Sequence, residues 1–429
     1  MKKILVFLLV VTLTPGASFG QQNIPLKLKV FIDCNSTWCD LQYIRSEINV
    51  VDFLLDNAAS DVHVLITSRG TGSGGEQYQL IFFGQRQFKS QTDTLQFSND
   101  ANSTEFERRD MLLKYLKTGL VPFIAKTAAV RNMEIRLKTN DSTGAAVADS
   151  SISSDPWNYW VLRLGVDGNI NGDANYKNTS YNGNLSANRI TDKLKVGMGI
   201  YWNKSNAAFN YDNNGVEENF VVNNHNWSVN QYLVSSINDH WSWAYEVKFS
   251  QNTFSNNKRR GYMRVAAEYN IFPYKEVNTK LFTMSYGLTA RRNKYYDTTI
   301  YNKINETLYG HRADAYVSLN QKWGNSYAGV SYHNYFHNWK FFNLGIDMYS
   351  NVRITGGLSF FIFAFGGLTR SQVFLVKGNA TAEEVLARRR QLASGYNYFT
   401  SIGINYRFGS KLNNVVNPRF DRSSYLNED

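Results

Sequence analysis

The sequence is poor in cysteine and proline and has no long apolar stretch. Of 429 residues, only 2 are Cys and 6 are Pro. After the N-terminal segment, no run reaches the roughly 18 apolar residues of a membrane-spanning helix, which excludes helical transmembrane spans. Scarce proline leaves room for long, uninterrupted strands. Aromatic residues are abundant, at 15%, and favour strands over disorder.

The two cysteines, Cys34 and Cys39, are too few and too widely spaced for a zinc site or a Cys-x-x-Cys redox motif. In an exported chain, the oxidising compartment favours a small local disulfide between them. The alternative is two free thiols near a strand end. The sequence indicates no metal site and no cofactor.

The first twenty residues have the pattern of a secretory signal peptide. Lys2 and Lys3 precede an apolar stretch over 4–13, and the small-residue site 18–20 precedes Gln21. An uncleaved anchor is the alternative, although the apolar stretch is short for a span. No Cys follows the cleavage site, which disfavours a lipoprotein.

The net charge of +11 is unevenly distributed. Residues 21–150 carry 14 basic and 15 acidic side chains, whereas 151–429 carry 30 basic and 20 acidic ones. Such asymmetry predicts an anionic partner for the C-terminal part. For an exported chain, lipid phosphate is a better candidate than nucleic acid.

Residues 21–138 predict a periplasmic α/β domain. Strands are expected at 26–34, 61–68, 78–83 and 133–137, and a helix at 38–57 because apolar residues recur at three- and four-residue steps. Thr104 and Glu107 form a capping box before a second helix with a leucine stripe. Residues 139–154, rich in Ser, Thr, Asp and Ala, predict a linker.

From 155 to 409 the apolar pattern changes to a period of two. Ile402 and Ile404 alternate with Gly403 and Asn405 near the end, and similar alternation recurs in about ten-residue segments. This pattern is typical of a transmembrane β-barrel, with apolar side chains outward and polar ones inward. The predicted fold is therefore an α/β domain followed by an all-β antiparallel transmembrane barrel of about 12 strands, with a periplasmic tail at 410–429.

Twelve strands are predicted to begin near residues 157, 178, 193, 217, 240, 259, 278, 306, 326, 339, 352 and 395. Ten or fourteen strands are alternatives. Short turns are expected at 191–192, 238–239, 272–276, 323–325 and 350–351. Longer external loops are expected at 203–215, 292–305 and 377–394, because barrels alternate short periplasmic turns with long external loops.

A soluble β-sandwich would also alternate, but without long and short turns in succession. Aromatic residues near the strand ends favour an interfacial girdle. They are Trp157, Trp160, Trp202, Trp241, Trp243, Tyr349, Tyr406 and Phe408.

Several motifs of the chain stand out together. They are Asp155-Pro156-Trp157-Asn158-Tyr159-Trp160, Glu268-Tyr269-Asn270-Ile271-Phe272-Pro273-Tyr274, and the segments 61–67, 383–392 and 413–420. Together they resemble a family of uncharacterised outer-membrane β-barrel proteins from Bacteroidota and related bacteria. The resemblance spans nearly the whole mature chain. It implies an outer-membrane location and supplies no catalytic residues.

Two patterns that could suggest chemistry have simpler interpretations. The glycine-rich segment 69–75 lacks the Lys and following helix of a phosphate loop, so a hairpin tip is expected. His333 and His337 would lie about 13 Å apart on a strand, too far for one metal. No Ser-His-Asp arrangement stands out. We therefore expect a non-enzymatic protein.

Three basic runs fall at the predicted external end of the barrel and could bind lipopolysaccharide phosphates, with Arg doing so through two parallel hydrogen bonds. Ordinary solvated loop charge is the alternative. The runs comprise Lys258, Arg259, Arg260, Arg291, Arg292, Lys294, Arg388, Arg389 and Arg390.

Charged residues of both signs are predicted to line the lumen, where they must be paired or hydrated. They are Arg163, Asp167, Lys195, Glu246, Lys248, Arg264, Glu268, Asp314, Asp347, Arg353 and Arg407. Phe361, Phe363 and Phe365 would also face inward, where they could bind an apolar ligand or pack against an inserted segment.

These patterns predict an outer-membrane protein that acts as a narrow channel or carrier, with a periplasmic docking domain. One alternative is a structural or assembly component with a filled lumen that binds a periplasmic protein partner. A weaker one is an outer-membrane enzyme. Expected partners are the outer membrane and lipopolysaccharide, and no nucleic acid.

Overall fold

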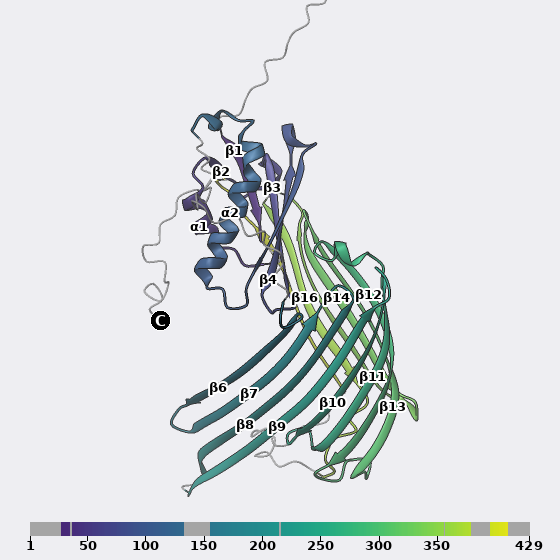
Figure 1. Ribbon diagram of the computed structural model, residues 1–429. Helices are drawn as coiled ribbons and strands as arrows, with labels where there is room; N and C mark the ends of the chain where they lie inside the picture. The colour runs from purple at the N-terminus through teal and green to yellow at the C-terminus, as the bar shows by residue number, and fades with distance from the viewer. Residues whose placement is uncertain are drawn as a thin grey trace, which may run out of the picture.

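The computed structural model describes residues 27–34, 37–132, 155–213, 216–355, 357–378 and 395–410, and shows an N-terminal α/β domain above a large curved sheet (Figure 1). The predicted signal peptide, linker and C-terminal tail lie outside the described residues, as does the predicted strand 133–137.

A five-stranded sheet forms the N-terminal domain, in the order β2-β1-β3-β4-β5. The first three strands pair in parallel and the last three are antiparallel. The strands are β1 (Leu28–Asp33), β2 (Val51–Phe53), β3 (Val62–Gly70), β4 (Glu76–Gly84) and β5 (Thr92–Asn99). β1, β3 and β4 were predicted and are confirmed; β5, an edge strand with a mostly exposed burial pattern, was not predicted.

The predicted helix 38–57 is wrong over most of its length. Only α1 (Leu41–Glu47) is helical, with Asp40 as its N-cap, and a 3₁₀ turn follows at Asn57–Ala59. Between them, Val51 pairs with Leu28 as β2. Parallel pairing with a buried strand thus overrides a helical apolar spacing, since β-branched valines suit strands.

Helix α2 (Glu105–Ile124) covers the sheet and closes the core. The predicted capping box of Thr104 and Glu107 is present. The leucine stripe is buried, and a Cβ at Gly119 would lie 2.1 Å from the Phe82 ring, so only glycine allows this close approach. Among the described residues, no helix has both the length and the apolar character needed to cross a membrane.

The second sheet contains twelve antiparallel strands in strict chain order, which confirms the predicted count. Every predicted start lies within six residues of the observed one, with the largest difference at β16. The strands are β6 (Trp160–Gly172), β7 (Tyr176–Ile190), β8 (Leu194–Asn213), β9 (Val216–Ser236), β10 (Trp241–Asn252), β11 (Asn257–Asn270), β12 (Lys280–Tyr295), β13 (Asn305–Gln321), β14 (Gly324–Tyr335), β15 (Asn338–Arg353), β16 (Leu358–Thr369) and β17 (Tyr396–Tyr406).

The twelve-stranded sheet is strongly curved but not closed. β6 and β17 are its two edges, and no pairing joins them within the described residues, so the closure expected of a barrel is not seen (Figure 1). A single sheet with every strand beside its sequence neighbour also contradicts the two-sheet sandwich alternative.

Two of the predicted connections are wrong. Residues 203–213 are not a loop but part of β8, paired from Asn203↔Asn226 to Asn213↔Val216. Likewise, β15 continues to Arg353, so its turn follows 350–351 instead of including it. Both stretches are polar, but their backbone groups are satisfied by the neighbouring strand. The 296–304 connection is long, as expected, and most of 377–394 lies outside the described residues.

Candidate functional site

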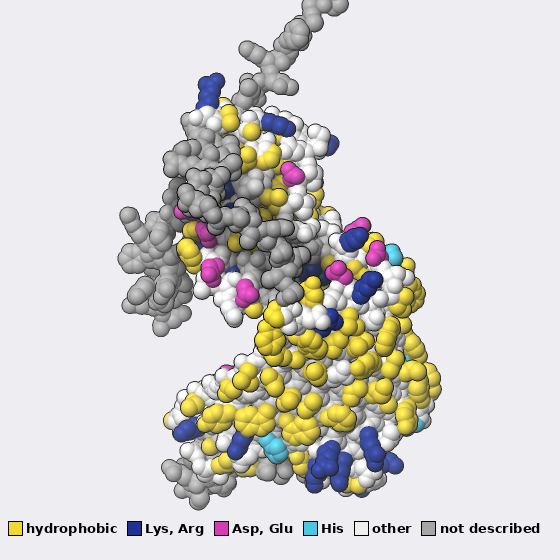
Figure 2. Space-filling model, viewed as in Figure 1, with side chains coloured by type: hydrophobic (Ala, Val, Ile, Leu, Met, Phe, Trp, Pro, Cys, Tyr) yellow, Lys and Arg dark blue, Asp and Glu magenta, His cyan; other side chains and the backbone are white. Residues whose placement is uncertain are grey.

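The two faces of the large sheet differ in chemistry. On β6, the apolar side chains of Leu162, Leu164 and Val166 are 57%, 77% and 80% exposed, while Arg163 and Asp167 lie on the opposite face. Apolar side chains gather over the outer face of the sheet (Figure 2). The alternation continues through the sheet because pairing carries each face from strand to strand.

The inner face of the sheet contains ten of the eleven charged residues that were predicted to face the lumen, and the eleventh, Arg407, directly follows β17. Two arginines share one of the acids: the Arg264 and Arg312 guanidiniums lie 2.9 and 2.8 Å from the Asp314 carboxylate. Asp167 accepts a hydrogen bond from the Asn182 amide at 2.7 Å. Tyr349, predicted for the outer aromatic girdle, also lies on this face, because it pairs with Phe363 and Tyr327.

The N-terminal domain lies across the end of the sheet where β6 begins and β17 ends (Figure 1). Arg69 of the domain donates a hydrogen bond to the Val277 carbonyl in the β11–β12 connection. Lys322, between β13 and β14, lies 3.8 Å from the centre of the Phe83 ring. The domain therefore contacts successive turns along one mouth of the sheet.

Both edges of the large sheet also reach this domain. Arg163 on β6 donates to the Ser73 carbonyl, and Arg407, just after β17, donates to the Leu55 carbonyl. Three residues predicted for the lumen thus contact the domain: these two and Arg353. Some of the basic side chains that give residues 151–429 their excess positive charge therefore lie at the interface with the domain.

One of these contacts is a buried cluster of charged residues. Arg353 at the end of β15 lies 2.6 Å from the Asp33 carboxylate, whose other neighbour is His63 at 3.3 Å. Asp33 and His63 are 2% and 0% exposed. The Arg353 guanidinium also stacks 4.9 Å above the Phe31 ring. Loss of one partner from an ion pair that is buried away from water leaves an uncompensated charge. Each residue of this cluster therefore stabilises the contact between the two parts of the chain.

The protonation states follow from burial and hydrogen bonding. Burial alone would raise the pKa of Asp33, but hydrogen bonds from His63 and Arg353 outweigh it and lower the pKa to about 2. Burial lowers the pKa of His63, against the opposing effect of Asp33. His63 is therefore neutral near pH 7, with Nε2–H donating to the carboxylate.

We expect the stability of the N-terminal domain to fall as the pH drops below about 6.5, the ordinary pKa of histidine. In the unfolded chain His63 binds a proton there, whereas the folded chain resists it, so each pH unit removes up to about 1.4 kcal/mol until the folded pKa is reached. Urea unfolding at pH 5 and pH 7 measures this loss. A His63→Gln variant should show a smaller pH dependence; an unchanged slope would contradict the assignment.

Sequence reasoning did not single out Asp33 or His63 as site residues. The available signal was a polar residue within an otherwise apolar strand. His63 interrupts the apolar run 62–66, and Asp33 ends an apolar strand. Polar groups in such positions need buried partners. The partner Arg353 lies 320 residues away, and only the tertiary structure brings it there.

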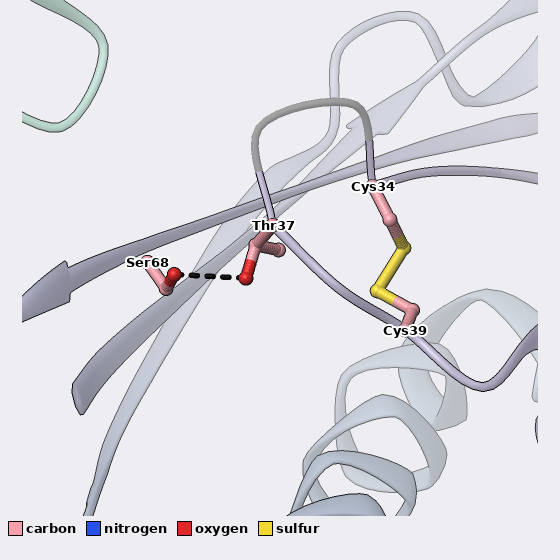
Figure 3. Close-up of a disulfide and its surroundings, with 4 residues drawn as sticks. All are labelled: Cys34, Thr37, Cys39 and Ser68. Carbon is pink, nitrogen blue, oxygen red and sulfur yellow. Dashed lines mark hydrogen bonds between the residues drawn. A yellow bond between two sulfur atoms is a disulfide. The ribbon is translucent and has the colours of Figure 1, made fainter. Parts of the chain in front are cut away.

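The disulfide between Cys34 and Cys39 is present, with a Cα–Cα distance of 6.1 Å (Figure 3). It closes the loop that directly follows Asp33. Within this loop, the Thr37 hydroxyl is 2.8 Å from that of Ser68 on β3. The loop borders a cavity of about 610 Å³ between the domain and the ends of β15–β17, which Arg353 and Arg407 also line.

The glycine-rich segment 69–75 forms the predicted hairpin tip, and this tip touches the large sheet. The Thr71 N–H donates to the Gly75 carbonyl at 2.8 Å. A Cβ at Gly72 would lie 2.6 Å from that of Ile190. Gly74, at φ +80°, has the Arg163 guanidinium where a side chain would stand. Because Gly72 and Gly74 have no side chains, the hairpin tip can approach the end of the large sheet closely.

The inner face carries an aromatic patch beneath the domain. Phe361, Phe363 and Phe365 all lie on this face, and Phe399 on β17 stacks on Phe365 at 5.6 Å. A cavity of about 890 Å³ is lined by part of this patch, and Arg69 of the domain also lines it. The patch and the domain thus border the same open cavity.

The basic runs divide between the two faces. Lys258, Arg259, Arg292 and Lys294 are exposed toward the end of the sheet opposite the domain. Arg260 and Arg291 point to the inner face instead, because they alternate with those neighbours, so the prediction that they bind lipopolysaccharide is wrong for these two. Residues 388–390 lie outside the described residues.

His333 and His337 do not form a metal site in the part of the chain that the structure describes, where no group of three or more potential ligands occurs. Both rings pack around Tyr335, with centroid distances of 4.7 and 5.9 Å. Their role here is packing.

Comparison with known proteins gives weak structural similarity only. No family model and no curated protein sequence matches the chain. Among solved structures, the chain is similar to the NanC porin, with 12% identity and a TM-score of 0.27 over 58% of this chain and 100% of that one. It is also similar to the translocator domain of the autotransporter NalP from Neisseria meningitidis, with 8% identity and a TM-score of 0.25 over 58% of this chain and 87% of that one.

Proposed function

We propose that the chain is a non-enzymatic outer-membrane β-barrel protein, a narrow channel or carrier whose N-terminal domain closes the periplasmic mouth. The observation that carries this proposal is the exposed apolar outer face of the twelve-stranded sheet, opposite a polar and charged inner face. A soluble monomer rarely exposes an apolar surface of this extent, whereas a lipid-facing barrel requires one.

Closure of the sheet follows from the same proposal. In hydrocarbon, unpaired N–H and C=O groups along β6 and β17 would each cost several kcal/mol. The edges must therefore pair with each other or with another strand in the membrane. A closed barrel of twelve strands would have a lumen of intermediate width. Eight-stranded barrels are filled by side chains, and sixteen-stranded barrels leave an open channel.

The filled lumen of a structural or assembly component is the second candidate, and the aromatic patch around Phe363 and Phe399 supports it. In that case the N-terminal domain would present its remaining surface to a periplasmic protein partner. An enzymatic role has no comparable support.

Planar-bilayer recording of the purified chain, with and without residues 21–150, tests the proposal. Discrete conductance steps in either form support a channel. Silence in both forms, from protein shown to be folded and inserted, would contradict transport and favour the filled-lumen candidate.

We also propose that the outward-facing cations near the far end bind lipopolysaccharide phosphates. Arg259 pairs with Lys294 across β11 and β12, so their charges lie side by side on the lipid-facing surface. Replacing Arg259, Arg292 and Lys294 by Gln should lower the lipopolysaccharide retained through purification severalfold, measured by phosphate or fatty-acid assay. Retention equal to that of the parent chain would show that these are ordinary solvated charges.

A further inference from the structure

Four cations converge on the inner face in the half of the sheet away from the N-terminal domain. Lys248, Arg260, Arg291 and Arg312 come from four consecutive strands, β10 to β13. Together they line a cavity of about 440 Å³. None of the motifs discussed above places these four residues together.

Strand register explains why they meet. Lys248 pairs with Tyr262, which in turn pairs with Arg291 on the next strand. Arg260 is two residues from Tyr262 and therefore lies on the same face, one row away. Because side chains alternate along a strand and align across it, these positions share one surface.

Within the described residues, the nearby acids form an ion pair with only one of the four cations, Arg312. Asp314 is shared between Arg312 and Arg264, and Glu306 accepts a hydrogen bond from the Tyr295 hydroxyl at 2.5 Å. Glu246 is the one acid that lines the cavity. In the described part of the chain, no ion pair is formed by the other three cations of the cluster.

The Arg291 guanidinium is held in place before any ligand arrives. Arg291 donates to the Tyr335 hydroxyl at 2.8 Å and stacks 5.6 Å from the Tyr262 ring. The Nε atoms of Arg260 and Arg291 are shielded from solvent and have no hydrogen-bond partner among the described residues. Arg260 and Arg291 are half-buried and form no ion pair in the described part of the chain, so they favour an anion. The fixed position of Arg291 lowers the entropy cost of binding one.

We propose that this cavity is a binding site for a small organic anion bearing a carboxylate or phosphate group. Arg260 and Arg291 hold the anionic group, and Lys248 adds positive potential. Arg312, paired with Asp314, and the Tyr201 and Tyr262 rings border the rest of the ligand. This rests on the proposed function, because the inner face must line a water-filled lumen for solutes to reach the site.

Calorimetric titration of the full-length chain in detergent at low salt, with citrate and separately with inorganic phosphate, tests the site. We expect saturable binding of at least one anion that weakens about tenfold or more in an Arg260→Gln/Arg291→Gln/Lys248→Gln variant. Stronger binding of citrate would identify a carboxylate ligand, and stronger binding of phosphate a phosphate ligand. Absence of saturable binding, or equal binding by the variant, would overturn the proposal.

A matched variant, Lys89→Gln/Lys114→Gln/Arg131→Gln, removes the same net charge from exposed positions of the N-terminal domain. It should bind like the parent chain, and circular dichroism should show that both variants keep their strand content. Bilayer recording separates the two proposals. Conductance without anion binding would overturn the site alone, and anion binding by a protein that never conducts would overturn the channel alone.

Discussion

Deletion of residues 21–150 is expected to convert a chain that conducts rarely into one that shows frequent, discrete conductance steps. The N-terminal domain contacts both edges of the large sheet and several turns between them, through Arg163, Val277, Lys322, Arg353 and Arg407. Because these contacts are spread from one edge of the sheet to the other, they hold the domain across this end of the sheet. Removing it opens the mouth without altering the twelve strands.

The control for this deletion is a full-length chain with weakened contacts. Replacing Arg353 and Arg407 by Gln removes two donors to the domain and leaves the twelve strands in place. We expect intermediate behaviour, with openings more frequent than in the parent chain. Identical conductance of the parent and truncated chains would show that the domain does not obstruct the mouth.

The second large effect is expected from Asp33→Ala, which should lower the stability of the N-terminal domain by about 3–5 kcal/mol, because it leaves buried His63 and Arg353 without their shared acceptor. Chemical unfolding of the full-length parent and variant chains, followed by hydrogen exchange of the backbone amides of residues 27–132, measures this loss. The same variant should also weaken the docking of the domain on the large sheet, because the Asp33 carboxylate forms the ion pair with Arg353.

Comparison with Arg353→Gln separates the two roles of Asp33. That variant keeps the His63–Asp33 hydrogen bond, so it should weaken docking more than the stability of the domain itself. A double-mutant cycle between Asp33 and Arg353 gives their coupling directly. Coupling near zero would mean that the contact contributes nothing to docking.

The sequence predicted the twelve strands well because their signal is local. Alternation at residues such as Leu162, Arg163 and Leu164 reports which face each side chain occupies, whatever the partner strand. It failed where two local signals competed. The 38–57 segment has helical spacing, yet Val51 is drawn into the sheet by pairing with Leu28, and the polar residues 203–213 resemble a loop although β9 pairs with them.

The candidate sites were predictable only in part. Alternation indicates the face on which a side chain lies, and ten of the charged residues predicted to line the lumen do lie on one face of the sheet. The runs containing Arg260 and Arg291 were treated as single patches, although alternation along β11 and β12 divides them between two faces. Which charges pair was not predictable, because Asp33 meets Arg353 across 320 residues.

By itself, the sequence determined the order of a small α/β domain and a twelve-stranded antiparallel sheet, since capping, alternation and turn residues act over a few positions. Only the tertiary structure decided that the domain contacts one end of the sheet and that four cations from four strands line one cavity. Those outcomes depend on strand register and on how the domain docks, which sum many weak contacts between residues far apart in the chain.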